Sequence, residues 1–147
     1  LSGENMEKSK QVLTEILRTM QAEQLSLRSA SRNAVGIELK NALAKQLQEY
    51  RSIEQEACAI ASARGWNIER VHALPNMLSV RLSKFALAHP KSDSKIAGMM
   101  IKSSTNGMIK TLNLQHHGPI KDARIVNLTQ KLLDCEMSGI QQMQGYV

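Results

Sequence analysis

Aromatic side chains are nearly absent from this chain of 147 residues, which contains one Trp, two Tyr and one Phe. β-Sandwiches and β-barrels draw on aromatic and β-branched residues, so this shortage argues against both. Only three Pro and eight Gly are present, which leaves little turn material and favours a few long elements. The apolar fraction of 42% rests on Leu, Ile, Val, Ala and eight Met, a composition that suits helices.

Long apolar runs are missing as well. No stretch approaches the ~18 consecutive apolar residues of a membrane-spanning helix, and the opening LSGENMEKSK does not resemble a signal peptide. We therefore expect a cytoplasmic protein that is not secreted by a signal peptide and has no membrane partner. The length predicts one domain covering residues 1–147, with residues 1–6 as a flexible tail.

Neither the cysteines nor the charged residues are clustered in the sequence. Cys58 and Cys135 show no CxxC spacing, and we expect two buried, reduced thiols; a disulfide between their helices is the alternative. The formal charge of +6 comes from 19 Lys and Arg against 13 Asp and Glu, spread without a basic cluster. A dedicated nucleic-acid reader more often shows such a cluster or stacking aromatics, so nucleic acid is not an expected partner.

Apolar residues recur at the 3.6-residue period in four stretches, which predict long helices. The first runs from about Glu7 to Asn33, the second from Ile37 to about Arg64, the third from after Ser92 or Ser94 to about Gln115, and the fourth from about Asp122 to Tyr146. Gly65 stands where a left-handed C-terminal cap is expected. The predicted inward positions include Val12, Leu13, Ile16, Leu17, Met20, Leu27, Ala30 and Ala34; Leu39, Leu43, Leu47, Tyr50, Ala57 and Ala61; Ile96, Met100, Ser103, Gly107, Thr111 and Leu114; and Val126, Leu132, Leu133, Met137, Ile140 and Met143.

The connection between the second and third helices, residues 65–93, is too long for a structureless loop in a compact domain. Four apolar residues recur in it at helical spacing and predict a short amphipathic helix: Leu74, Leu78, Leu82 and Phe85. Its length allows the chain to return along the bundle. The sequence therefore predicts an all-α four-helix bundle with a long helical crossover between helices 2 and 3; an up-down-up-down bundle with a decorated loop is the alternative.

Three glutamates interrupt the apolar stripes of different helices, so we expect Glu23, Glu54 and Glu136 to point toward the common core. A buried carboxylate must be paired, protonated or bound to a cation. Ferritin-like di-iron sites take a Glu from two helices and a Glu-x-x-His from the other two. Here Ala57 and Gly139 stand where the two histidines would be.

Two interpretations of these glutamates stay open. In the first they pair with Tyr50, Asn106 or an inward-reaching Arg or Lys, or lie nearer the surface than a helical wheel suggests. In the second they are candidate metal ligands for a di-iron centre or, with carboxylates alone, a hard ion or manganese. The one Glu-x-x-His in the chain, Glu69 to His72, lies in the crossover, and His116 and His117 are expected to cap a helix C-terminus. No catalytic residue and no cofactor are predicted.

A family resemblance appears at the second helix, ELKNALAKQLQEYRSIEQEACAIASARGW. This stretch resembles ferritin-like proteins related to spore coat protein F of spore-forming Firmicutes, in which a mid-helix Gln-Leu pair is followed by an Arg-Gly-Trp ending. Gln46, Leu47, Arg64, Gly65 and Trp66 match that pattern. The stretches SKIAGMMIKSSTNGMIKTL and LTQKLLDCEMSGIQQMQGYV look like the second half of the same bundles.

The resemblance implies a ferritin-like bundle associated with the spore or its coat. Together with the absence of a catalytic set, it favours a non-enzymatic structural or protein-interaction role, with a second copy of the chain or spore coat components as partners. The alternative is a carboxylate-ligated metal-binding protein with oxidase or storage chemistry.

Overall fold

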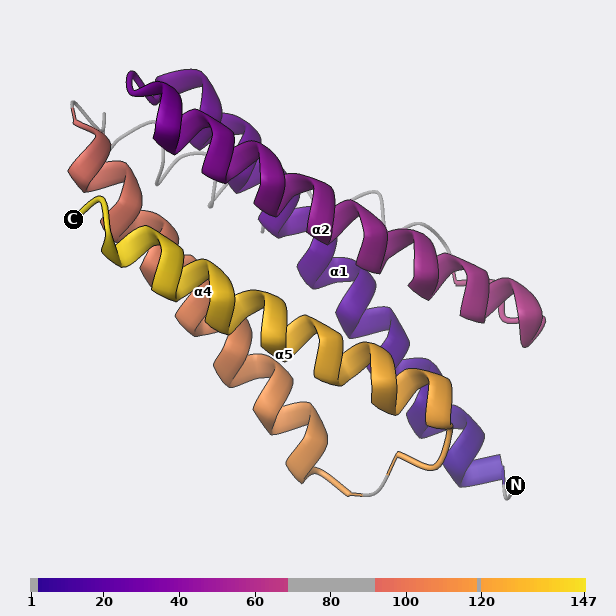
Figure 1. The fold of residues 1–147 in the computed structure, drawn as a ribbon. Coiled ribbons are helices and arrows are strands. Elements are labelled where there is room, and N and C mark those ends of the chain that lie inside the picture. The colour runs from indigo at the N-terminus through magenta and orange to yellow at the C-terminus, as the bar shows by residue number, and fades with distance from the viewer. Residues whose placement is uncertain (1–2, 69–91, 119) are drawn as a thin grey trace.

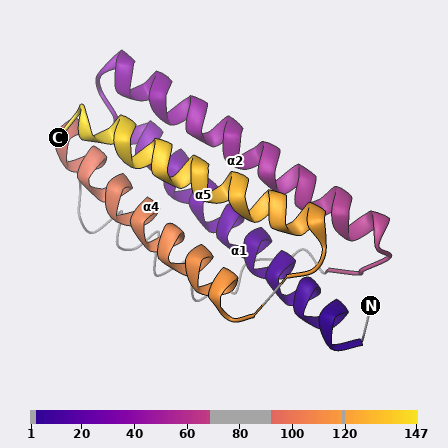
Figure 2. The same cartoon turned by 60° about the horizontal axis from the view of Figure 1, so that its bottom comes forward.

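A computed structural model describes residues 3–68, 92–118 and 120–147, and within these ranges the chain forms four α-helices and no strand. They are α1 (Gly3–Asn33), α2 (Ile37–Ala63), α4 (Asp93–His116) and α5 (Ala123–Gln144). The four helices lie side by side with their long axes roughly aligned (Figures 1 and 2). The predicted all-α class and the four-helix bundle are confirmed. The predicted amphipathic helix around Leu74 and Phe85 lies outside the described residues.

The helices form two antiparallel hairpins, α1–α2 and α4–α5, whose ends meet (Figure 1). At one end the Asp93 carboxylate, in the first turn of α4, accepts hydrogen bonds from the backbone N–H groups of Val35 and Gly36, just before α2. At the other end Arg64, just after α2, pairs with Asp122, just before α5. Hence α2 and α4 run in the same direction, and the end of α2 and the start of α4 lie at opposite ends of the bundle.

The core is built from the faces that the periodicity predicts. All eight predicted positions of the first helix are buried. The predicted positions of α2 and α4 are also buried, except for the half-buried Leu47, Ser103 and Leu114. Two predictions for α5 are wrong, because Val126 and Met137 are 40% and 51% exposed. The apolar residues of α5 span a wider arc than its two neighbours cover. The arc that α2 and α4 bury is centred on Leu132 and includes Ile125, Leu128, Cys135, Gly139 and Met143.

Helix ends follow local capping chemistry. Ser92, rather than Ser94, caps α4 by accepting a hydrogen bond from the Lys95 N–H at 3.2 Å, and Asp122 caps α5 by accepting from the Arg124 N–H at 3.1 Å. α1 begins at Gly3, four residues before the predicted start.

The C-terminus of α2 ends in a Schellman motif. Gly65 has φ of 68°, its N–H donates to the Ser62 carbonyl at 3.1 Å, and the Trp66 N–H donates to the Ala61 carbonyl at 2.9 Å. Trp66 is half-buried and packs against the core, as the hydrophobic contact of this motif. The predicted left-handed cap is confirmed.

Two glycine substitutions should change stability in opposite directions. A Cβ at either Gly65 or Gly98 would meet no atom within 4 Å, so packing is not altered. Gly65→Ala forces alanine into the left-handed region and should destabilise by ~1–2 kcal/mol, whereas Gly98→Ala, inside α4, should stabilise by ~0.5–1 kcal/mol. Urea unfolding followed by circular dichroism measures both. Equal changes in the free energy of unfolding for the two variants would contradict the left-handed conformation assigned to Gly65.

The Asp93 contact should make stability depend on pH. The two backbone donors, Val35 first and then Gly36, lower the pKa of the Asp93 carboxyl below its usual value. Its stabilisation is therefore complete above the unfolded-state pKa of ~3.9 and is lost as pH falls through the lower folded-state pKa. Asp93→Asn should thus lower the urea midpoint at pH 7, and the difference from the unmutated chain should shrink as pH falls below the unfolded-state pKa and through the folded-state pKa. The matched control is Asp134→Asn, at an exposed acid on α5; an identical pH profile for both variants would exclude the contact as a source of stability.

Candidate functional site

Polar side chains form a buried layer across the middle of the bundle. Glu23 on α1 and Glu136 on α5 are both 0% exposed, so their predicted positions inside the bundle are confirmed. Glu54 on α2 is only half-buried, and its predicted inward position is wrong. The buried face of α2 is rotated away from Glu54, toward residues that the sequence-based face omitted: Ala42, Gln46, Ile53 and Ile60.

Hydrogen bonds within this layer join the four helices. The Tyr50 hydroxyl on α2 donates to Glu136 Oε2 on α5 at 2.8 Å. The Ser103 hydroxyl on α4 lies 3.0 and 2.8 Å from the two carboxylate oxygens of Glu23 on α1. Gln24 Nε2, also on α1, donates to Glu54 Oε2 on α2. The interpretation in which a core glutamate pairs with Tyr50 is thus confirmed for Glu136.

Gln46 completes the layer from α2. Its Nε2 donates to the Tyr50 hydroxyl oxygen at 3.2 Å and to Ser104 Oγ of α4 at 3.4 Å. Its Oε1 is buried and has no hydrogen-bond partner among the described residues. The apolar periodicity predicted no interior position for Gln46 or Ser104. The available signal was that Gln46 precedes Tyr50 by four residues, which places the two on one helix face.

The environment of Tyr50 keeps its hydroxyl protonated. Burial is the main cause that raises the tyrosine pKa well above its usual value, and the nearby charges of Glu136 and Glu23 raise it further. A phenol that holds its proton is a permanent donor, which is what a buried carboxyl needs. Tyr50 therefore serves as a hydrogen-bond donor in this layer.

Two glycines make space for the long polar side chains. A Cβ at Gly107 on α4 would lie 2.7 Å from Glu136 Oε1, and a Cβ at Gly139 on α5 would lie 2.4 Å from Gln46 Nε2. Both distances are below ordinary van der Waals contact. The small, polar character of α4 that is visible in the sequence thus accommodates the carboxyl of Glu136.

The packing around Gly139 also tests the ferritin-like di-iron set. A histidine would be needed at this position, and even a Cβ there would lie 2.4 Å from Gln46 Nε2, so the Gln46 amide would have to leave its place in the polar layer. In the described ranges, no three His, Cys, Asp or Glu are grouped so that they could hold a metal ion. The single Glu-x-x-His, Glu69 to His72, lies outside those ranges. The arrangement of the described residues does not fit a di-iron centre.

The cysteines differ from each other. Cys135 is buried as predicted, but Cys58 is exposed, so the prediction is wrong for Cys58, which lies on α2 away from the buried face. Neither is part of a disulfide. The Cys135 thiol donates to Glu49 at 3.3 Å, and burial, followed by that hydrogen bond, raises the pKa of the thiol. Cys135 is a small buried group with little thiolate character.

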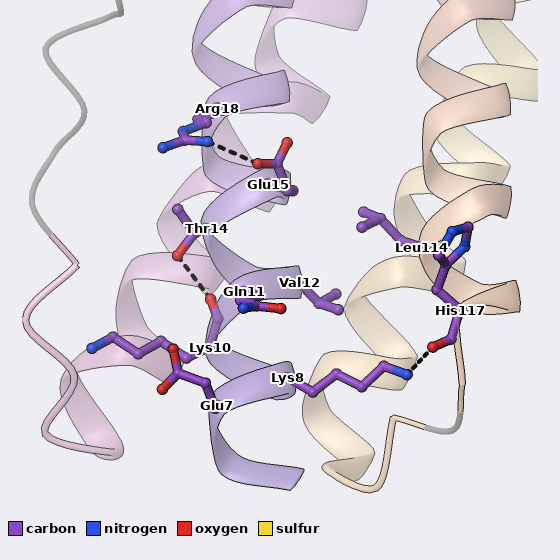
Figure 3. A pocket seen from close by; sticks show the side chains of 10 residues that line it. All are labelled: Glu7, Lys8, Lys10, Gln11, Val12, Thr14, Glu15, Arg18, Leu114 and His117. Carbon is purple, nitrogen blue, oxygen red and sulfur yellow. Dashed lines mark hydrogen bonds and ion pairs between the residues drawn. The ribbon is translucent and has the colours of Figure 1, made fainter. Parts of the chain in front are cut away.

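A surface hollow of about 520 Å³ lies between α1 and the end of α4 (Figure 3). Val12 and Leu114 point toward each other across it, and Lys8 donates to the backbone carbonyl of His117. Its charged side chains carry both signs, and Arg18 pairs with Glu15 at 2.8 Å. His117 caps α4, as predicted, with Nδ1 2.7 Å from the Asn113 carbonyl oxygen. The hollow presents no converging catalytic groups among these side chains.

No protein-family model, curated protein or solved structure matches this chain. Within the described residues, every helix is too short or too polar to cross a membrane.

Removing the Tyr50 hydroxyl tests the polar layer. Tyr50→Phe leaves a fully buried carboxyl without this donor and should destabilise by ~1–3 kcal/mol, because losing one partner exposes the desolvation cost of the other. The matched control is Tyr146→Phe, at a half-buried tyrosine near the C-terminus, and it should change stability by less than ~0.5 kcal/mol. Urea midpoints at pH 7 report both. Similar decreases in the free energy of unfolding for the two variants would show that the hydrogen bond from Tyr50 to Glu136 does not stabilise the fold.

Proposed function

We propose that this chain is a non-enzymatic helical bundle with a structural or protein-interaction role. One observation carries the proposal: the interior groups that could do chemistry are engaged with one another across helices. Tyr50 donates to Glu136, and Ser103 donates to Glu23. An acid or base committed in this way specifies which helices pack together.

Burying polar side chains in such a layer adds little to the stability of the fold, but it determines which helices pair with each other. Replacing buried polar groups by well-packed apolar ones is often neutral or stabilising, so their value here is the unique pairing that they impose. Each contact joins a different helix pair: Gln24–Glu54 joins α1 to α2, and Gln46–Ser104 joins α2 to α4. A rigid bundle with one internal arrangement is suited to present its surfaces to partners.

The proposal includes a ferritin-like topology with a long crossover. It is supported by the opposite positions of the end of α2 and the start of α4, because a connection between them has to travel the length of the bundle. The short loops within each hairpin agree with the expected short, long, short order. In this topology the crossover is the segment between Ile68 and Ser92.

The proposal also includes association with a spore or its coat, through the resemblance to proteins related to spore coat protein F. Four of the five residues that carry the resemblance have a structural task here. Gln46 belongs to the polar layer, Gly65 and Trp66 form the Schellman motif, and Arg64 pairs with Asp122. A likeness carried by such residues supports a shared architecture, with self-assembly or coat components as the partners.

One observation favours the alternative of a carboxylate-ligated metal protein with storage or oxidase chemistry. Among the residues that the structure describes, Gln46 Oε1 is a buried oxygen without a hydrogen-bond partner, and it belongs to the amide that contacts Tyr50, the donor to Glu136. Oxygen ligands of this type suit a hard ion or manganese. The alternative makes a distinct prediction for metal content.

Metal analysis separates the two functions. Protein purified without chelator and then equilibrated with Mn²⁺ or Fe²⁺ should hold well below one ion per chain after desalting, and its melting temperature should not shift with either ion, because binding to the folded state would raise it. Glu136→Gln should behave in the same way as the unmutated chain in both measurements. One tightly held ion per chain that Glu136→Gln removes would overturn the structural proposal in favour of the metal protein.

A further inference from the structure

Apolar side chains of α4 and α5 recur along one side of the α4–α5 hairpin, with a hollow at one end; we call this strip the α4–α5 groove. On α5, Val126, Leu133 and Ile140 recur every seven residues and so lie on one line of the helix. Val126 is 40% exposed and Leu133 is buried, yet Leu133 is not part of the central core cluster. On α4, the half-buried Ile101 and Met108 form the matching line. These two lines make the floor of the groove.

A hollow at one end of the hairpin shows that the ends of the two lines lie close together, while Ile101 farther along α4 also packs against the core. Gln115 continues the α4 line by another seven residues, and Val126 starts the α5 line. The two residues, with Ile120 and Thr129, line a hollow of about 200 Å³.

The opposite sides of both helices are occupied by the bundle. On α4 the side with Ser103 contacts Glu23 of α1, and on α5 the side with Cys135 contacts Glu49 of α2. The groove therefore faces away from the α1–α2 hairpin.

The two rims of the groove differ in charge. Exposed residues at seven-residue spacing form the α4 rim: Lys95, Lys102, Ile109 and His116. The corresponding exposed residues of the α5 rim are uncharged: Ala123, Gln130, Met137 and Gln144. No Asp or Glu occurs between Ser94 and Lys121, so the side chains of α4 after its first residue carry only positive charge.

The rims also carry large apolar groups that water reaches. Ile109 is 49% exposed and Met137 is 51% exposed, on opposite rims, and Leu112 between them is 37% exposed. A contiguous exposed apolar surface edged by polar groups marks an interaction site in a soluble protein. Its elongated shape between two helices matches the recognition of a partner helix through its apolar face.

We infer that the α4–α5 groove docks an amphipathic helix of a protein partner whose apolar face is flanked by acidic side chains on the side that meets α4. This inference rests on the protein-interaction role proposed above. The lysines of the α4 rim supply the charge complementarity that selects an acidic partner. A second copy fits less well, because it brings the same lysine-bearing rim and a further net charge of +6.

Two fluorescent peptides test the inference with the full chain. Both are helices of about 20 residues, long enough to form in solution, and they share a leucine face that is flanked by Glu in one and by Lys in the other. Fluorescence anisotropy should show the Glu-flanked peptide binding at least ~10-fold more tightly. Its advantage should shrink as salt is raised, because exposed charges are screened.

Surface variants assign the binding to the groove. Lys102→Glu should remove or reverse the preference for the Glu-flanked peptide, whereas Lys45→Glu, at an exposed position on α2, should not. The double variant Ile109→Gln, Met137→Gln should weaken binding of the Glu-flanked peptide about tenfold or more. Its matched control is Ile37→Gln, at a 73% exposed position at the start of α2. Circular dichroism confirms that each variant keeps the helical fold.

Several outcomes would overturn the inference: no binding of either peptide, equal affinity for the two, or no effect of Lys102→Glu. A dimer in sedimentation that Met137→Gln dissociates would assign the groove to a second copy. Binding to phosphatidylserine vesicles that Met137→Gln abolishes would assign it to a membrane surface. If neither peptide binds, the outcome of the metal analysis is unaffected. If the metal analysis finds a bound ion that Glu136→Gln removes, the proposed function is overturned, but the peptide-binding result is unaffected.

Discussion

The cost of removing two carboxyl groups from water governs the middle of this bundle. Glu23 and Glu136 are fully buried, and an isolated charge in such a place is prohibitive. The surrounding residues are arranged to supply donors, with Tyr50 at 2.8 Å from Glu136 and Ser103 at 2.8 Å from Glu23. Even the composition of α4 follows from this requirement, because Gly107 has to leave space for the carboxyl of Glu136.

Local features of the sequence were enough to predict the helices. Their boundaries follow from apolar periodicity and from caps that involve only neighbouring residues, such as Ser92 and Gly65. The same periodicity placed Glu23 and Glu136 inside, because both lie near the centre of a stripe. The errors concern the edges of the stripes. Glu54, Val126 and Met137 lie where the rotation of a helix about its axis decides burial, and that rotation is set by neighbouring helices.

Partners across helices were harder to predict than burial. Tyr50 was one of several residues considered for pairing with a core glutamate, but Ser103 and Gln24 were not identified as donors. A hydrogen bond between helices depends on their relative height and separation, which no spacing within one helix reveals. The position of Gly139 beside Gln46 is a second example, since only the packed structure shows that a larger residue at 139 would displace the Gln46 amide.

The contacts at the two ends of the bundle are of another kind from those in the middle. Arg64 is exposed, and water solvates a surface ion pair almost as well as a protein partner does, while Asp93 accepts two backbone hydrogen bonds. These contacts align the hairpins but contribute modest energy. The discrimination between correct and incorrect packing is therefore concentrated in the interior layer.

The Glu23–Ser103 contact has a consequence for how the first and second hairpins can slide past each other. Moving α1 along α4 by one turn, ~5.4 Å, would bring Glu23 opposite Met99 or Gly107. Neither side chain can donate a hydrogen bond to a carboxylate, so the slipped arrangement would lose the hydrogen bond that Ser103 supplies. A leucine at position 23 would tolerate either arrangement. The glutamate, in contrast, favours the one axial register of the two hairpins in which it meets Ser103.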